Sequence, residues 1–96
     1  MIVHTLDKKI KLKNKVAQQL DKKTVSMILS FIGYEISNRF TFINNPSMTI
    51  SDNGYIKDWG STNFSGDIFT FLMDFKDMGF TNSVKYVADC LGIDYE

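Results

Sequence analysis

Residues that bind metals or cross-link a chain are scarce in this sequence. It holds one cysteine, Cys90, and one histidine, His4, among 96 residues. A structural zinc site needs four ligands, usually Cys and His, so we predict that the chain binds no metal. A single cysteine also excludes a disulfide within the chain and is typical of a reducing compartment. The sequence has no glycine-rich phosphate loop, and we expect no cofactor.

Long apolar runs are missing as well. No stretch approaches the roughly 20 apolar residues that span a membrane, and the first residues lack the charged and then apolar order of a signal peptide. Hydrophobic residues make up 44% of the chain, which is enough for a core in one small domain covering residues 1–96. We therefore predict a soluble, cytoplasmic, single-domain protein.

Charge is unevenly distributed, although the net charge is zero. Residues 1–23 carry seven lysines and two acidic residues, a net charge of +5, whereas residues 24–96 carry four basic and nine acidic residues, a net charge of −5. Such a basic segment is typical of contact with a phosphate backbone or an acidic partner, which makes Lys11 and Lys13 candidate nucleic-acid contacts. The alternative is a solvated, lysine-rich surface without a binding role.

Two interpretations apply to residues 1–14. Apolar residues alternate with lysines there, which indicates either a short edge strand, where lysines discourage unwanted pairing, or a loose basic arm. Beyond this segment, apolar residues recur at helical spacing up to Gly33, which is placed as a helix stop. Asn14 or Asp21 can cap a helix, and we predict one helix over residues 15–32, with a potential break near Asp21.

Three short strands are expected next, at residues 36–42, 48–51 and 55–59. The last two flank an Asn-Gly pair at positions 53 and 54, which strongly favours a hairpin because a type I′ turn needs positive φ at both central residues. Pro46 precedes the second of these strands, where its missing N–H costs little.

Two further helices are expected in the C-terminal part. The first starts at Asp67 or Ser65, ends at Gly79 and has an apolar stripe with the spacing of a buried face. This stripe consists of Ile68, Phe71, Leu72 and Phe75. The second helix is capped by Thr81 and closed by Gly92. The predicted fold class is α+β, with a three-stranded antiparallel sheet packed against about three helices.

Phe69, Met73 and Met78 fall outside the buried stripe. They either pack against the first helix or form an exposed apolar patch, and such a patch commonly marks a partner site. Aromatic and Met residues are frequent interface anchors. These three residues are therefore the candidate partner-binding residues.

Several short motifs follow one another in a defined order. Asn45-Pro46-Ser47-Met48 leads into the hairpin, Gly66-Asp67 begins a helix, and residues 80–93 read FTNSVKYVADCLGI. Together they resemble the zinc-binding domain at the N-terminus of bacterial DnaG-type primases, over residues 21–93. The resemblance implies a zinc-ribbon-like sheet. The four ligand positions of that family correspond here to Asn38, Thr41, Lys57 and Gly60, which form no ordinary zinc site, so the expected sheet is metal-free.

The resemblance also implies a function. In that family the domain binds single-stranded template through its sheet and helps a separate catalytic domain to start a primer. It implies here a non-catalytic DNA-replication accessory that acts with a DNA polymerase or primase catalytic subunit and with single-stranded DNA, and that originates from a phage or mobile element. The alternatives are an inhibitor or decoy that blocks a nucleic-acid enzyme, or a purely structural interaction protein. No catalytic residue is predicted.

Residue types on two predicted strands suit the binding of a single strand. Tyr55, Lys57 and Trp59 alternate and so share one strand face, and Arg39 and Thr41 alternate on the neighbouring strand. Aromatic faces stack with bases, and basic side chains contact phosphates. The alternative is that Tyr55 and Trp59 are half-buried core residues and that Lys57 only extends its stem along them.

Overall fold

Four helices and four strands make up the computed structural model, which describes residues 3–60 and 62–93, with side chains from residue 10 onward. The helices are α1 (Val3–Ala17), α2 (Lys22–Phe31), α3 (Ile68–Phe75) and α4 (Phe80–Leu91). The strands are β1 (Thr41–Phe42), β2 (Asn45–Ile50), β3 (Ile56–Asp58) and β4 (Ser65–Gly66). The α+β class is confirmed, with one more helix and one more strand than predicted.

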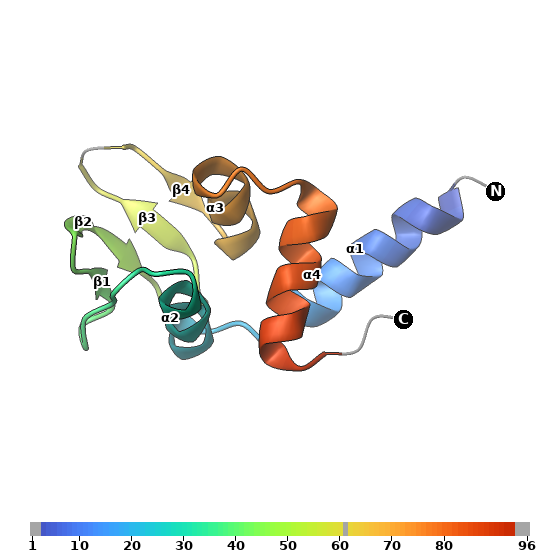
Figure 1. Cartoon of the computed structure of the whole chain (residues 1–96), viewed down its shortest axis with the longest axis horizontal. Coiled ribbons are helices and arrows are strands. Elements are labelled where there is room, and N and C mark those ends of the chain that lie inside the picture. Colours follow the sequence, from blue (N-terminus) through green and yellow to red (C-terminus); the bar gives the residue numbers. More distant parts are fainter. Residues whose placement is uncertain (1–2, 61, 94–96) are drawn as a thin grey trace.

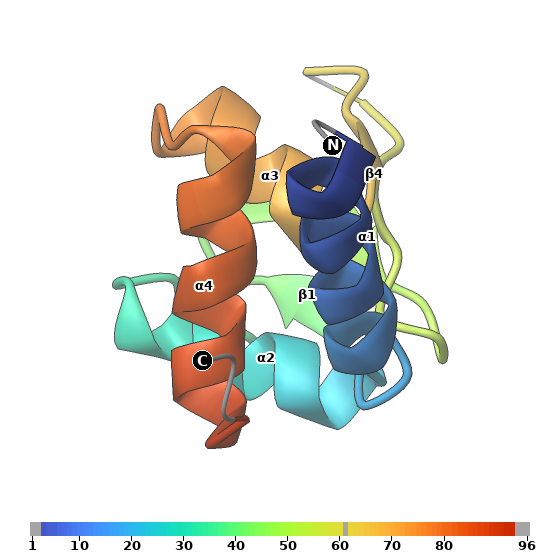
Figure 2. The ribbon, with the colours of Figure 1, turned by 90° about the vertical axis from the view of Figure 1, so that its right-hand side faces the viewer.

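Helix α1 occupies the segment for which an arm or an edge strand was expected. That expectation is wrong for residues 3–14, and residues 1 and 2 lie outside the described part. Val16 is fully buried and Leu12, one turn earlier, is partly buried, a helical spacing that the alternation with lysines concealed. α1 lies beside α4 and packs against it (Figures 1 and 2), so a tertiary contact supplies the burial that this segment needs.

The expected helix over residues 15–32 is two helices, and the break near Asp21 is confirmed. The Asp21 carboxylate accepts from the Thr24 backbone N–H at 2.8 Å, while Thr24 Oγ1 accepts from the Asp21 N–H at 2.8 Å. This capping box starts α2, and the bond from the Thr24 amide is the main cause that holds the pKa of Asp21 below its ordinary value. Gly33 follows the end of α2 with φ +96°, as predicted.

The sheet is antiparallel with the order β1-β2-β3-β4. The fourth strand was missed because it has two residues, one of them glycine, and so carries no hydrophobic period. β1 is shorter than the predicted strand over residues 36–42, because a turn from Ser37 to Thr41 and a positive φ of 61° at Phe40 interrupt it. Pro46 lies inside β2 and not before it, in the segment where the β1–β2 register shifts, a position that tolerates proline.

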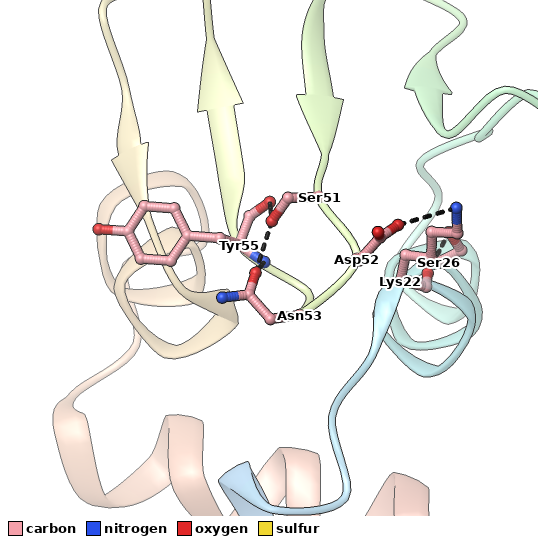
Figure 3. A network of polar contacts seen from close by, with 6 residues as sticks. All are labelled: Lys22, Ser26, Ser51, Asp52, Asn53 and Tyr55. Carbon is pink, nitrogen blue, oxygen red and sulfur yellow. Dashed lines mark hydrogen bonds and ion pairs between the residues drawn. The ribbon is translucent and has the colours of Figure 1, made fainter.

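The β2–β3 hairpin is confirmed, but its turn is not type I′. The Ser51 carbonyl accepts from the Gly54 N–H at 2.9 Å, and the Ser51 N–H donates to the Tyr55 carbonyl at 2.8 Å. Gly54 has φ +84°, whereas Asn53 is not among the described residues with positive φ. The connection is therefore a three-residue turn with a glycine bulge. Asn53 Oδ1 supports it by accepting from Ser51 Oγ and from the Tyr55 N–H (Figure 3).

The tip of this hairpin packs against the start of α2. Lys22 Nζ lies 3.0 Å from Asp52 Oδ1, and the Lys22 N–H donates to the Asp52 carbonyl at 3.3 Å (Figure 3). A Cβ atom added to Gly54 would lie 2.8 Å from Val25 Cγ2. The close approach, as well as the positive φ, therefore requires glycine at position 54.

Helices α3 and α4 follow in the predicted order, with different boundaries between them. Asp67 caps α3 by accepting from the Thr70 N–H at 2.9 Å, so the helix starts at Asp67 and not at Ser65, the other predicted start. α3 ends at Phe75, and Asp77 follows with a positive φ of 58°. Gly79 does not end α3 but has extended backbone and is the N-cap of α4, so Thr81 is not the cap. Gly92 ends α4 in the left-handed region, as predicted.

The molecule is layered along its long axis. The sheet lies at one end, α2 and α3 cover one of its faces, and α4 with α1 lies beyond them (Figure 1). The core between the layers includes Ile28, Leu29, Ile56, Phe71 and Val87. The predicted stripe of α3 is buried except for Phe75, which is 38% exposed. No helix in the described ranges is both long enough and apolar enough to cross a membrane.

Candidate nucleic-acid interface

The outer face of β3 presents the three residues that the sequence placed on one strand face. Exposure alternates from position 55 to 59: Ile56 and Asp58 are buried, whereas Tyr55 is 46% exposed, Lys57 is exposed and Trp59 is 70% exposed. The period of two is that of a strand with one solvated face. Tyr55 and Trp59 are therefore surface residues, and the half-buried core alternative is wrong for Trp59.

A row of polar side chains crosses the sheet on this face. The register pairs Thr41 with Thr49, Thr49 with Lys57, and Lys57 with Ser65. Directly paired residues point to the same side of an antiparallel sheet and lie about 5 Å apart. The row thus carries three hydroxyls and one ammonium group, and none of its members is acidic.

The Trp59 side chain is held in place at the end of β3. Its indole N–H donates to Thr49 Oγ1 at 3.1 Å, and its backbone N–H donates to the Ser47 carbonyl at 2.9 Å. Lys57 Nζ lies 4.3 Å from the indole ring centroid, within the range of a cation–π contact. The ring is therefore oriented before any ligand arrives, and most of its surface remains open.

Beneath this face, Asp58 organises the loop that follows β3. Its carboxylate accepts from Ser47 Oγ at 2.5 Å, from Thr62 Oγ1 at 2.6 Å, and from the Gly60 and Thr62 backbone N–H groups at 2.9 Å each. Hydrogen bonds to the charged form favour it, and these, led by the bond from Ser47, hold the pKa of Asp58 well below its ordinary value. Asp58 therefore fixes the loop beside Trp59. This role of Asp58 was not predicted from the sequence.

Arg39 does not join the stripe on β3. It lies exposed in the turn from Ser37 to Thr41, and its backbone N–H donates to Ser37 Oγ at 3.2 Å. The predicted neighbour relation is wrong, because β2 intervenes between β1 and β3 in the sheet. Arg39 therefore stands at the β1 edge of the candidate face.

The two N-terminal lysines also lie away from this stripe. Lys11 is exposed on α1, which Figure 1 shows at the opposite end of the long axis from the sheet. Lys13 Nζ lies 3.8 Å from Asp67 Oδ2 and 5.7 Å from the Phe69 ring centroid. Its ammonium group therefore packs at the start of α3. The structure does not bring Lys11 or Lys13 together with Tyr55, Lys57 and Trp59.

The primase resemblance relates Asn38, Thr41, Lys57 and Gly60 to zinc ligands. In the structure these positions lie in or beside two turns, and in each turn a side-chain oxygen accepts hydrogen bonds from backbone N–H groups. Ser37 Oγ accepts from the Arg39 and Thr41 N–H groups at 3.2 Å each, and Asp58 plays the same part in the turn at Gly60. Thr41 and Lys57 are separated by β2, roughly 10 Å or two strand spacings. Within the described ranges, no three His, Cys, Asp or Glu side chains are grouped so that they could hold a metal.

The candidate partner-binding residues differ in burial. Phe69 is 1% exposed and belongs to the core, so it offers no surface to a partner. Met73 and Met78 are partly buried. The alternative of an exposed apolar patch is therefore wrong for Phe69. The exposed apolar side chain of α3 is instead Phe75, which the helical spacing places in the buried stripe.

No known protein could be related to this chain by comparison. A search of protein-family models, of curated proteins and of solved structures found no match to the chain. The primase resemblance therefore depends on the sequence motifs alone, and the candidate interface depends on the geometry of the sheet face.

Proposed function

We propose that this chain is a non-catalytic DNA-replication accessory that binds single-stranded DNA on the outer face of its sheet and acts with a DNA polymerase or primase catalytic subunit. The observation that carries the proposal is the orientation of Trp59, an exposed indole held by Thr49 with the Lys57 ammonium beside it. The motif order shared with the primase domain supports the choice of DNA replication as the process.

The chemistry of the face suits an unpaired strand. Stacking of one base on an aromatic side chain contributes about 1–3 kcal/mol and tolerates any base. Tyr55 and Trp59 offer two such rings four residues apart, and Lys57 between them offers a cation for the backbone. The hydroxyls of Thr49 and Ser65 are donors for phosphate oxygens. A double helix offers no free base faces for this arrangement, which favours single strands.

Binding by this chain alone is expected to be weak. Affinity for nucleic acid depends largely on phosphate neutralisation, and the chain has a net charge of zero with one lysine in the row across the sheet. A catalytic partner would supply further phosphate contacts and the polymerising site. This division of work matches the role of the primase domain that the motifs resemble.

The direct test uses Trp59 as its own probe, because it is the sole tryptophan. Its fluorescence is measured while a dT oligonucleotide of about 12 nucleotides, within the range of known single-strand site sizes, is added at low salt. We expect saturable quenching that weakens as salt increases. A matched duplex is the control and should quench less. Unchanged fluorescence with every oligonucleotide, at concentrations where a partner complex binds, would contradict the proposed face.

The process is tested by primer synthesis. A candidate polymerase is given an unprimed single-stranded template with and without this chain. Primers that form only with both proteins would support the accessory role. Suppressed extension of existing primers would favour the alternative of an inhibitor or decoy, since that protein would occupy the same surface without promoting initiation.

A further inference from the structure

A second site lies on the other side of the sheet from Trp59. A pocket of about 210 Å³ opens between β1, β2, the segment after α2 and the end of α3. Its apolar walls are formed by Tyr34, Phe42, Met48, Phe71 and Phe75. Phe42 and Met48 are inward-facing residues of the sheet. The pocket and the outer face can therefore be occupied at the same time.

The aromatic walls are fixed by one another. Phe71 and Phe75 are stacked with centroids 4.6 Å apart and planes 9° apart, and Tyr34 meets Phe71 edge-on at 5.3 Å. Phe42 lies 5.7 Å from Phe71 and closes the other side. Mutual packing of this kind limits side-chain movement, so the pocket is present before a ligand arrives and the cost of ordering it on binding is small.

The mouth of the pocket is acidic and amide-rich. Glu35 and Asn44 line it and are exposed. In the part of the chain with described side chains, the Glu35 carboxylate has no ion pair. The nearby cation, Lys76, places its Nζ 5.0 Å from the Tyr34 ring centroid and so covers that ring. Glu35 therefore favours a group with a positive charge next to an apolar body.

From these features we infer that the pocket receives one apolar side chain of Phe or Leu size from a partner protein, with an adjacent Arg or Lys of that partner facing Glu35. Buried aromatic or aliphatic anchors in pockets dominate many protein interfaces. Ile43, half exposed beside the pocket in the β1–β2 turn, extends the apolar contact area. This partner contact is separate from strand binding and does not require that the outer face bind DNA.

Size and charge distinguish this occupant from others. An apolar cavity of roughly 150 Å³ takes up a benzene molecule, so this pocket has room for one ring or branched side chain. It is smaller than the roughly 300–1,000 Å³ typical of small-molecule sites. A nucleotide is disfavoured because its phosphate would approach the Glu35 carboxylate, and the nearby cation, Lys76, lies over the Tyr34 ring and is not among the lining residues. A protein side chain brings no such charge.

The test follows the amide resonances of the ¹⁵N-labelled full chain while the peptide acetyl-Gly-Ser-Phe-Arg-Ser-Gly-amide is added. Two peptide controls replace its Phe by Ala or its Arg by Glu. Two protein variants accompany them: E35Q removes the charge at the mouth, and N44W fills the mouth from an exposed turn position. The matched control, D89N, neutralises an exposed acid on α4 that does not line the pocket.

We expect saturable shifts at Tyr34 and Asn44 with the Phe-Arg peptide and none with the Ala peptide. E35Q and the Glu peptide should each weaken binding roughly two- to fivefold, as for a solvent-exposed ion pair, while D89N binds as the wild type does. N44W should abolish the shifts, and if it fails to fold, E35Q and the peptide pair still decide the result. Equal binding of the Ala peptide, no saturable shift at the pocket, or shifts there with a dT hexamer in place of the peptide would overturn the inference.

Discussion

The indole N–H of Trp59 donates to Thr49 Oγ1 across the β2–β3 pair, at 3.1 Å. Thr49 is itself the register partner of Lys57, whose Nζ lies 4.3 Å from the same indole ring. One threonine therefore links the aromatic and the cationic member of the candidate interface. An exposed tryptophan that is free to rotate would lose more entropy when it stacks on a base, so this bond prepares the ring for binding.

Replacing Trp59 by alanine should weaken binding of single-stranded dT oligonucleotides by about 1–3 kcal/mol, the contribution of one stacked base. The fold should persist, because the ring is mostly exposed. Anisotropy of a labelled oligonucleotide measures the affinity. The matched control is F31A, which removes an exposed ring on α2, away from the sheet face. Equal losses in both variants would show that the stripe on β3 has no special role.

Replacing Lys57 by glutamine should reduce the salt dependence of that binding. Each phosphate contact on a single strand contributes about −0.7 to the slope of log K against log salt concentration, so the K57Q slope should be shallower by roughly that amount. K11Q removes an exposed lysine on α1, and it should leave the slope unchanged if the sheet face is the whole site. A shallower slope for K11Q would show that the N-terminal lysines also contact the DNA backbone.

Asp58 should make the folded state sensitive to acid. Its pKa in the folded protein is lowered by hydrogen bonds from Ser47, Thr62 and Gly60, so the unfolded chain binds the proton more readily. The stabilisation is fully present above the unfolded pKa of about 3.9 and is lost as pH falls toward the folded pKa. Urea unfolding of the wild type and D58N should therefore show a stability difference at neutral pH that shrinks in acid.

The control for this measurement is D52N, which alters an almost fully exposed acid paired with Lys22. Its effect on the urea midpoint should be small at every pH, since exposed ion pairs contribute little. A D58N protein as stable as the wild type at neutral pH would contradict the role assigned to Asp58 in fixing the loop after β3.

Gly54 should be intolerant of substitution. Alanine there would adopt φ +84°, and its Cβ would lie 2.8 Å from Val25 Cγ2. A left-handed conformation at a residue other than glycine costs about 1–3 kcal/mol, and the contact with α2 adds to it. G79A is the matched control, because a Cβ at Gly79 meets nothing within 4 Å and φ is −73°. Thermal unfolding should show a clear loss for G54A and a much smaller change for G79A.

Local signals predicted much of this structure. Capping at Asp21 and Asp67, the end of α4 at Gly92 and the position of the hairpin were all readable from the sequence, because each depends on residues within one or two turns of chain. The alternation that exposes Tyr55, Lys57 and Trp59 was readable for the same reason. The scarcity of Cys and His by itself leaves too few ligands for an ordinary structural zinc site.

The tertiary structure decided which helices, strands and side chains are neighbours. The lysine alternation before residue 15 is compatible with a strand or a helix, and the packing of α1 on α4 selects the helix. Phe69 lies off the stripe of its own helix but is buried, because α4 packs against α3 and Lys13 of α1 lies over its ring. Arg39 is kept from β3 by the strand order, and Ser65 enters the polar row only through pairing of a strand too short to predict. These outcomes depend on contacts between distant segments, which periodicity and capping within one segment do not specify.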